Sequence, residues 1–387
     1  MFKIQTLNKI SPKGLDLFPR DKYEVASEFS SPDAIVLRSF KMHDMELPES
    51  LKAIARAGAG VNNIPIDRCS EQGIVVFNTP GANANAVKEL VLAGMLLASR
   101  DIIGGVNWAN SLKGEDDVPK LIEKGKSNFA GNELKGKTLG VIGLGAIGAM
   151  VANSAIELGM NVIGYDPYLS VEGAWELSNE IQKATGLETL LSQVDYISIH
   201  VPLLDSTKDM FNSKTFAMMR DGVKIMNFAR GGLVNNDDVK EAIKEGKVSC
   251  YVTDFPTEDI LGVDGIIPIP HLGASTIESE ENCAVMAVNQ VKDYLENGNI
   301  RNSVNFPKCY LTKKEDGQRI TISNRNVPNM ISELTSILAK HNINICDMLN
   351  KSRGDIAYNI IDVNSEITDS VIDELKAIDG VIAVRVI

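Results

Sequence analysis

Three residues whose side chains could together oxidise an alcohol are Arg230, Glu258 and His271, and each follows a short apolar run. A histidine can take the proton of a hydroxyl near neutral pH while hydride leaves the carbon. A carboxylate on its far nitrogen would fix the tautomer and stabilise the imidazolium. An arginine can bind a substrate carboxylate bidentately and polarise the adjacent carbonyl. Each residue alone would most simply be a polar loop residue, so the assignment depends on their joint placement after a nucleotide-binding motif.

That motif is a glycine-rich segment upstream of the three residues. Gly143, Gly145 and Gly148 form G-x-G-x-x-G between an apolar run and a helical pattern. The first glycine permits a tight turn, the second lets backbone approach a pyrophosphate, and the third brings the helix close to the sheet. The helix that begins at Ala146 and Ile147 offers unpaired N–H groups and a positive dipole end to phosphates.

Asp166 closes the motif, eighteen residues after Gly148 and directly after a second apolar run. It is placed to accept hydrogen bonds from both ribose hydroxyls and to repel a 2′-phosphate. An ordinary structural turn would not require strand, turn, helix, strand and acid in this order. The segment therefore predicts a dinucleotide site, with NAD as the cofactor.

Alternating apolar runs and helical patterns must position these residues, and such alternation predicts an α/β protein whose ligands gather at the carboxyl ends of parallel strands. Asp101 to Asn132 has weak periodicity and is interpreted as an exposed surface segment. Strands are expected at Phe2 to Leu7, Ala34 to Arg38, Ala53 to Ala57, Ile74 to Phe77, Thr138 to Ile142, Asn161 to Tyr165, Tyr196 to Val201, Val223 to Phe228, Val248 to Asp254 and Ile266 to Pro270, and helices at Ala84 to Ser99, Ala146 to Leu158 and Ser275 to Asn297.

The chain is acidic, with a formal net charge of −12, so an anionic substrate must be held by a few local cations. This charge argues against nucleic acid or a membrane as partner. Arg38 and Arg56 end two expected strands and are candidate anion ligands, although by itself each is more simply a solvated surface charge. Lys88 lies near the start of an almost wholly apolar helix, where it could snorkel, pair with Glu89 or face a substrate anion.

The remaining composition is that of a globular protein, with 44% hydrophobic and 23% charged residues. A length of 387 residues predicts two or three domains. The five cysteines are scattered and lack C-x-x-C spacing, which indicates reduced thiols in a cytoplasmic protein. With four histidines and no H-E-x-x-H pattern, no metal site is expected. No stretch has the apolar length of a membrane span.

Several segments closely resemble the D-isomer-specific 2-hydroxyacid dehydrogenases: G-L-G-A-I-G…Y-D-P, N-F-A-R-G-G-L-V-N, D-F-P-T-E-D and P-H-L-G-A-S-T. V-L-R-S-F, R-A-G-A-G-V-N-N and F-N-T-P-G-A-N look like the phosphoglycerate-oxidising branch of that family. The resemblance implies NAD-dependent oxidation of D-3-phosphoglycerate to 3-phosphohydroxypyruvate, the first step of L-serine biosynthesis. The alternatives are a broader D-2-hydroxyacid dehydrogenase, such as a glyoxylate or 2-oxoglutarate reductase, and an NAD-sensing corepressor.

The same resemblance implies individual roles. Arg230 would be the substrate-binding catalytic arginine, with Glu258 and His271 as the acid–base pair. Lys88 replaces an alanine that is usual in the family, which adds a cation near the expected substrate cleft. The implied substrate-binding residues are Arg38, Ser39, Arg56, Asn78 and Lys88, and the implied cofactor-binding residues are Gly143, Gly145, Ala146, Ile147, Gly148, Asp166, Pro202, Ala229 and Asp254, the last at the nicotinamide amide.

The resemblance also implies the domain organisation. A flavodoxin-like substrate domain would comprise residues 1–100 plus 275–305, and a Rossmann-type NAD-binding domain residues 101–274. The last substrate-domain helix would start with a capping box of Ser275 and Glu278 and stop at Gly298. A charged linker, residues 306–318, would lead to a third domain, residues 319–387.

The third domain has a β-α-β-β-α-β pattern, which predicts a ferredoxin-like fold. The expected strands are Arg319 to Ser323, Asn344 to Asn350, Ala357 to Val363 and Val381 to Val386, and the expected helices are Pro328 to Lys340 and Val371 to Ile378. By physics alone this is a small packing or dimerising domain. Asn329 stands where the loop glycine of similar domains is usual, and asparagine tolerates positive φ better than most residues.

This region resembles an ACT domain, a regulatory module that binds amino acids at paired interfaces. The resemblance implies a homodimer or homotetramer with L-serine as effector. Asn326 and Asn344 match the asparagines that hold such a ligand, and Asn324 stands where a ligand-binding histidine is often found.

Overall fold

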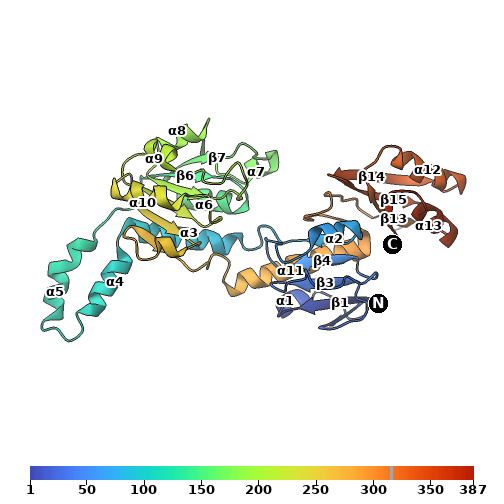
Figure 1. Ribbon diagram of the computed structural model, residues 1–387, viewed down its shortest axis with the longest axis horizontal. Helices are drawn as coiled ribbons and strands as arrows, with labels where there is room; N and C mark the ends of the chain where they lie inside the picture. Colours follow the sequence, from blue (N-terminus) through green and yellow to red (C-terminus); the bar gives the residue numbers. More distant parts are fainter. Residues whose placement is uncertain (314–316) are drawn as a thin grey trace. The chain divides into compact units, whose positions relative to one another are not determined.

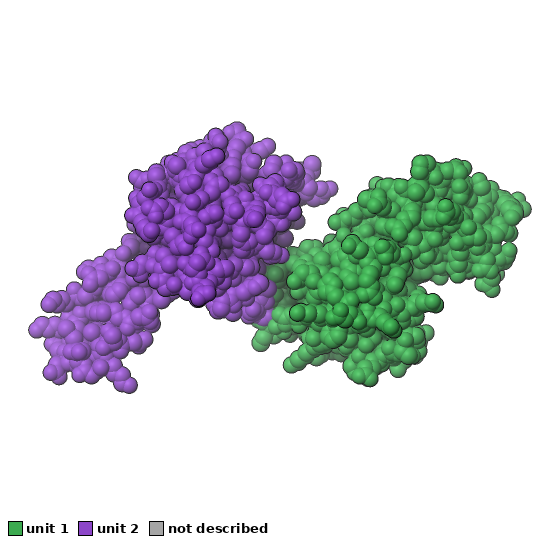
Figure 2. All heavy atoms as spheres, viewed as in Figure 1, with its two compact units in different colours: residues 1–83, 277–387 green, residues 84–276 purple. Residues whose placement is uncertain are grey.

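The computed structural model describes residues 1–313 and 317–387, which divide into two compact units (Figure 2). Unit 1 comprises Met1–Asn83 and Ile277–Ile387, and unit 2 comprises Ala84–Thr276. The expected linker, residues 306–318, includes residues 314–316, which lie outside the described residues.

Unit 2 is built on a seven-stranded sheet of order β12-β11-β10-β9-β6-β7-β8. Figure 1 labels β6 and β7 in this sheet. Every neighbouring pair is parallel. Strand order reverses at β6, which has β7 on one side and β9 on the other, and this is the strand order of a Rossmann fold. The prediction of a Rossmann-type sheet is confirmed. The strands are β6 (Thr138–Ile142), β7 (Asn161–Tyr165), β8 (Gln182–Lys183), β9 (Tyr196–Ile199), β10 (Val223–Asn227), β11 (Val248–Thr253) and β12 (Ile266–Pro268).

Most helices of unit 2 bury apolar residues. The expected helix at Ala84–Ser99 is α3, which packs on α6 and β10 and buries Val91 and Met95 completely. The other helices are α6 (Ala146–Glu157), α7 (Val171–Trp175), α8 (Leu187–Leu191), α9 (Ser213–Ala217), α10 (Asn236–Lys244) and the 3-10 turn η2 (Glu258–Ile260).

Residues 101–132 contain helices that the sequence pattern does not predict. They are α4 (Ile102–Ser111), α5 (Val118–Gly125) and the 3-10 turn η1 (Lys126–Phe129). Asp101 caps α4 by accepting a hydrogen bond from the Gly104 N–H, and Trp108 packs on Phe129. None of the residues in these three elements is buried, as expected for an exposed surface segment.

The first part of unit 1 is a five-stranded parallel sheet of order β2-β1-β3-β4-β5. This is the flavodoxin-like order, as expected. One strand, β2, was not predicted. The elements are β1 (Phe2–Leu7), α1 (Pro12–Leu15), β2 (Tyr23–Ala26), β3 (Ala34–Leu37), β4 (Ala53–Arg56), α2 (Ile66–Glu71) and β5 (Val75–Phe77).

Helix α11 (Ile277–Asn297) packs on α1 and β4 and completes the core of this sheet (Figure 1). It begins at Ile277, so Ser275 lies outside its N-cap position. Gly298 ends the helix with a φ of 70°, the left-handed conformation that favours glycine at a helix C-terminus.

The C-terminal part of unit 1 is a four-stranded antiparallel sheet of order β14-β15-β13-β16 with two helices. Its β-α-β-β-α-β order confirms the ferredoxin-like prediction. Asn329, directly before the first helix, has a φ of 72° and so replaces the loop glycine as expected. The elements are β13 (Gln318–Arg325), α12 (Met330–Lys340), β14 (Ile345–Arg353), β15 (Ile356–Val363), α13 (Asp369–Lys376) and β16 (Val381–Val386).

Arg319 joins this antiparallel sheet to the end of α11. Its side chain is 0% exposed and donates two hydrogen bonds to the Asp362 carboxylate, at 2.6 and 2.8 Å. Its Nη1 donates to the carbonyls of Asn297 and Leu311, at 2.9 and 2.8 Å. The guanidinium is therefore both neutralised and hydrogen-bonded, which a buried charge requires.

Replacing Arg319 by methionine should lower the free energy of unfolding by about 3–5 kcal/mol, because Asp362 would be left buried and unpaired. Urea denaturation measures the loss. The double variant Arg319→Met/Asp362→Leu should recover much of it. The control is Lys340→Met, which breaks an exposed ion pair with Glu374 and should cost only about 0–1 kcal/mol. Equal losses in the two single variants would show that the buried pair has no special role.

Candidate functional site

In the turn from β6 into α6, two glycine positions have no room for a side chain, and a third glycine faces open space. Gly143 has a φ of 86°, and a β-carbon there would lie 2.6 Å from the His200 carbonyl oxygen. A β-carbon at Gly148 would lie 1.9 Å from the Gly143 oxygen. At Gly145 a β-carbon would meet no atom within 4 Å. The first and third glycines are thus required by the fold, while the second leaves the backbone open to a ligand.

The start of α6 and Asp166 fit a dinucleotide at this turn. Ala146 and Ile147 are the first residues of α6, whose first N–H groups have no intrahelical acceptor. The Asp166 carboxylate accepts hydrogen bonds from the N–H groups of Leu144 and Tyr168, at 2.9 and 2.8 Å. These bonds hold Asp166 against the glycine-rich turn. The remaining lone pairs of its carboxylate can accept hydrogen bonds from ribose hydroxyls.

His200 lies beneath this turn and carries no charge near neutral pH. Burial lowers the pKa of His200 to about 4, and its Nε2 is hydrogen-bonded to the Ser198 hydroxyl at 2.7 Å. Pro202, the next expected cofactor residue, is exposed in the loop after β9, where its carbonyl accepts a hydrogen bond from the Thr207 hydroxyl.

Asn227, the last residue of β10, shapes the turn that carries Arg230. Its buried side chain accepts a hydrogen bond from the Ala229 N–H and donates to the Arg230 carbonyl, at 3.3 and 2.9 Å. The Arg230 side chain is exposed and donates one hydrogen bond, to the Ala229 carbonyl. It has no ion pair within residues 1–313 and 317–387, so its guanidinium can bind a carboxylate.

Asp254, at the end of β11, holds the loop of His271. It is 1% exposed, and its two carboxylate oxygens accept hydrogen bonds from the N–H groups of Leu272 and Gly273, at 2.7 and 2.8 Å. His271 itself has a φ of 53°, which is uncommon for a residue other than glycine. Asp254 therefore stabilises a strained backbone at a candidate catalytic residue.

Glu258 and His271 lie in loops of the same unit but are not joined. Both side chains are exposed, and no hydrogen bond or ion pair links these two described residues. The imidazole packs instead against Phe255, with ring centroids 4.9 Å apart. The carboxylate–imidazole contact expected from the sequence is thus absent from this arrangement of the side chains.

Unit 1 brings four expected substrate residues together after β3, β4 and β5. Arg38 forms an ion pair with Glu280 at 2.5 Å, and its carbonyl accepts a hydrogen bond from Arg56 Nε at 2.9 Å. The neighbouring Ser39 N–H donates to Asn8, and the Asn78 side chain donates to the Ala59 carbonyl.

The absence of a side chain at Gly60 makes room for the Arg56 guanidinium, because a β-carbon there would lie 2.7 Å from Arg56 Nη1. Lys88 belongs to unit 2, on α3. Its side chain is 18% exposed and lies 3.8 Å from the Glu89 carboxylate, so one of the three alternatives, pairing with Glu89, is realised.

The expected effector asparagines have different surroundings. Asn324 is buried, and its side-chain oxygen accepts a hydrogen bond from Asn359 at 2.8 Å. Asn326 and Asn344 are exposed, the first donating a hydrogen bond to the Gly354 carbonyl.

Two residues of the site, Asn227 and Phe255, were not singled out from the sequence. Asn227 could have been found, because a polar residue at the end of an apolar strand needs a partner. Phe255 gave no such signal.

No helix of residues 1–313 and 317–387 is long and apolar enough to cross a bilayer. In the same part of the chain, no three His, Cys, Asp or Glu side chains converge as metal ligands would.

Comparison with known proteins relates this geometry to a family. Residues 92–274 match the family described as D-isomer specific 2-hydroxyacid dehydrogenase, NAD binding domain. The D-3-phosphoglycerate dehydrogenase of Haemophilus influenzae is 32% identical over 400 residues, covering 99% of this chain and 94% of that protein.

Two further comparisons cover less of this chain. The Methanocaldococcus jannaschii protein of the same name is 37% identical over 295 residues, 74% of this chain, which spans about half (54%) of that relative's length. An NAD+-bound 3-phosphoglycerate dehydrogenase structure from Entamoeba histolytica aligns with a TM-score of 0.59 at 26% identity, over 79% of this chain and 98% of that chain.

Two alanine substitutions should separate the structural from the binding glycine. Gly148→Ala should destabilise the protein and abolish NAD binding, because the β-carbon would overlap the Gly143 oxygen. Gly145→Ala should change the free energy of unfolding by no more than about 0.5 kcal/mol and still weaken NAD binding. Urea denaturation and calorimetric titration with NAD measure the two effects. Normal NAD affinity in Gly145→Ala would place the pyrophosphate elsewhere.

Proposed function

We propose that this chain, which belongs to the D-isomer-specific 2-hydroxyacid dehydrogenase family, oxidises D-3-phosphoglycerate to 3-phosphohydroxypyruvate with NAD. This reaction is the first step of L-serine biosynthesis. The observation that carries the proposal is the placement of Arg230 and the Asp254-held loop of His271 at the carboxyl ends of β10 to β12, in the sheet whose β6 turn fits NAD. In this proposal unit 2 binds NAD, and the strand ends of unit 1 bind the substrate phosphate.

The chemistry assigns one task to each side chain. His271 takes the proton of the substrate hydroxyl, and Arg230 binds the carboxylate and polarises the developing carbonyl. When bound, NAD accepts the hydride. Glu258 pairs with the imidazolium as it forms, since catalytic hydrogen bonds that are absent without substrate often form only in the complex.

Substrate choice rests on Arg38, Arg56, Ser39 and Asn78. In an acidic chain these residues gather two guanidinium groups at one edge of a sheet. Arginine binds phosphate bidentately, so this pair suits a phosphorylated hydroxy acid better than an unphosphorylated one.

A turnover screen tests the proposal. D-3-phosphoglycerate, D-glycerate and D-2-hydroxyglutarate are each offered with NAD and with NADP. The expected result is the highest kcat/KM for D-3-phosphoglycerate with NAD, because Asp166 repels a 2′-phosphate. Preference for D-2-hydroxyglutarate would indicate the broader dehydrogenase, and no turnover of any substrate would favour an NAD-sensing protein.

His271→Ala should lower kcat on the order of 100-fold or more with little change in NAD affinity, because a general base is lost. Glu258→Gln should mainly shift the pH–rate profile, since its task is to stabilise the imidazolium. Steady-state rates across pH measure both effects. Near-normal turnover in His271→Ala would exclude it as the base.

Arg38→Gln should raise KM for D-3-phosphoglycerate more than KM for D-glycerate, because only the first carries a phosphate. Lys88→Met is the comparison, and a similar selective increase there would add Lys88 to the phosphate site. If Arg38→Gln raises both KM values equally, Arg38 does not contact the phosphate.

The C-terminal sheet and its helices serve in this proposal as an ACT-type regulatory domain of a homodimer or homotetramer. L-serine should lower the rate in a titration, with Asn326 and Asn344 offering amide donors and acceptors to the zwitterion. Serine inhibits only if it binds the slower state more tightly. Asn344→Ala should raise the serine concentration needed for half-inhibition, and an unchanged value would move the effector away from this residue.

A further inference from the structure

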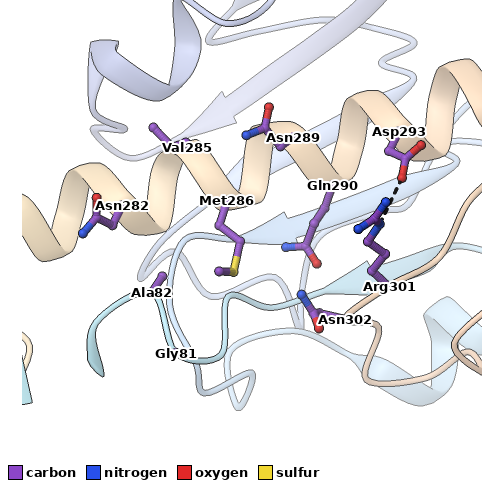
Figure 3. A pocket seen from close by; sticks show the side chains of 10 residues that line it. All are labelled: Gly81, Ala82, Asn282, Val285, Met286, Asn289, Gln290, Asp293, Arg301 and Asn302. Carbon is purple, nitrogen blue, oxygen red and sulfur yellow. Dashed lines mark ion pairs between the residues drawn. The ribbon is translucent and has the colours of Figure 1, made fainter. Parts of the chain in front are cut away.

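A pocket of about 680 Å³ with both polar and apolar walls lies along α11 (Figure 3). Amide side chains supply most of its polar groups, and an ion pair between Asp293 and Arg301 lies at one end. The amides come from Asn282, Asn289 and Gln290 on the helix and from Asn302 on the segment beside it. All these residues belong to unit 1.

Gln290 carries an unpaired oxygen in this pocket. The residue is 7% exposed, and its Nε2 donates a hydrogen bond to the Asn78 carbonyl at 2.9 Å. That bond sets the orientation of the amide, and its Oε1 is buried with no hydrogen-bond partner within the described chain. A buried acceptor without a donor is unfavourable, and such groups in native proteins call for an explanation. A ligand that donates a hydrogen bond would supply one.

Arg301 offers the opposite kind of group. Its Nε lies 3.4 Å from Asp293 Oδ2, and the guanidinium lies over the Tyr310 ring at 4.3 Å. The other Asp293 oxygen already accepts hydrogen bonds from Asn297 and Asn299. Both Asp293 oxygens therefore have partners within the protein. The terminal N–H groups of Arg301 have no hydrogen-bond acceptor among residues 1–313 and 317–387, and they can bind a carboxylate.

We propose that this pocket binds a small carboxylate that carries a hydrogen-bond donor on the adjacent carbon, which is the chemistry shared by α-amino acids and α-hydroxy acids. The carboxylate binds Arg301 and the Asn302 amide, and the ammonium or hydroxyl donates to Gln290 Oε1. Met286, one helical turn before Gln290, is unbranched and flexible and can make room for the donor.

Binding in this pocket would affect the position of the Asn78 backbone. The Asn78 carbonyl accepts the Gln290 hydrogen bond, and its N–H donates to the Asn302 carbonyl at 3.2 Å. Both ends of this backbone unit are thus fixed by residues of the pocket. The site is distinct from the asparagines of the C-terminal sheet and does not depend on the proposed reaction.

Calorimetric titration of the full-length protein tests the pocket with L-serine, D-glycerate and acetate. L-serine or D-glycerate should bind, acetate should bind about tenfold or more weakly, and the tighter of the first two identifies the class of ligand. Arg301→Gln removes the cation, and Gln290→Met removes the amide with little change in volume. Each should weaken binding by about tenfold or more.

The matched control is Lys292→Gln, which removes a cation from the same helix outside the pocket. It should bind as the unchanged protein does. Thermal melting confirms that each variant is folded, and either pocket variant alone suffices for the test.

Two outcomes would overturn the proposal: no binding at tens of millimolar, or unchanged binding in the folded pocket variants. Turnover of D-3-phosphoglycerate is measured on the same preparations. Binding without turnover would reject the proposed function and retain the pocket, and turnover without binding would do the reverse.

Discussion

The turn between β6 and α6 has no space for a side chain at Gly143 or Gly148. The close approach of this strand and helix determines how unit 2 arranges its candidate cofactor site. The strand and the helix approach so closely that a β-carbon at Gly148 would overlap the Gly143 oxygen. Because of this proximity, α6 starts directly after Gly145, where the backbone faces open space. Asp166 also lies within hydrogen-bond distance of the Leu144 N–H. One steric constraint thus positions the helix dipole, the open backbone and Asp166, the acid that we propose selects NAD.

Two buried polar side chains fix the loops that follow the neighbouring strands β10 and β11. Asn227 shapes the Arg230 turn from the end of β10, and Asp254 holds the His271 loop from the end of β11. Both residues act on backbone groups rather than on side chains, so the loops are fixed while Arg230 and His271 stay exposed. Local strain at His271 is offset by two charge-assisted hydrogen bonds to Asp254.

Most elements that position the site could be predicted from the sequence, because their strands are buried and their apolar runs are short and bounded. Strand β2 and helices α4 and α5 were missed because they bury little: α4 and α5 have no buried residue, and β2 has one. Side-chain pairing was less predictable. The sequence predicts that Glu258 and His271 share one rim, but not that Phe255 occupies the face of the imidazole, because rotamers depend on contacts that no spacing encodes.

The core of unit 1 joins residues from the two ends of the chain. Val36 and Phe77 share one apolar cluster with Ala287 from α11 and Tyr358 from β15. Unit 2 is continuous in sequence, so it can complete its core while the rest of the chain is still being synthesised. Unit 1 cannot, because its first strands must wait for partners more than two hundred residues away. Closing so long a loop slows folding, and the N-terminal strands remain exposed to chaperones and to aggregation until the last strands leave the ribosome.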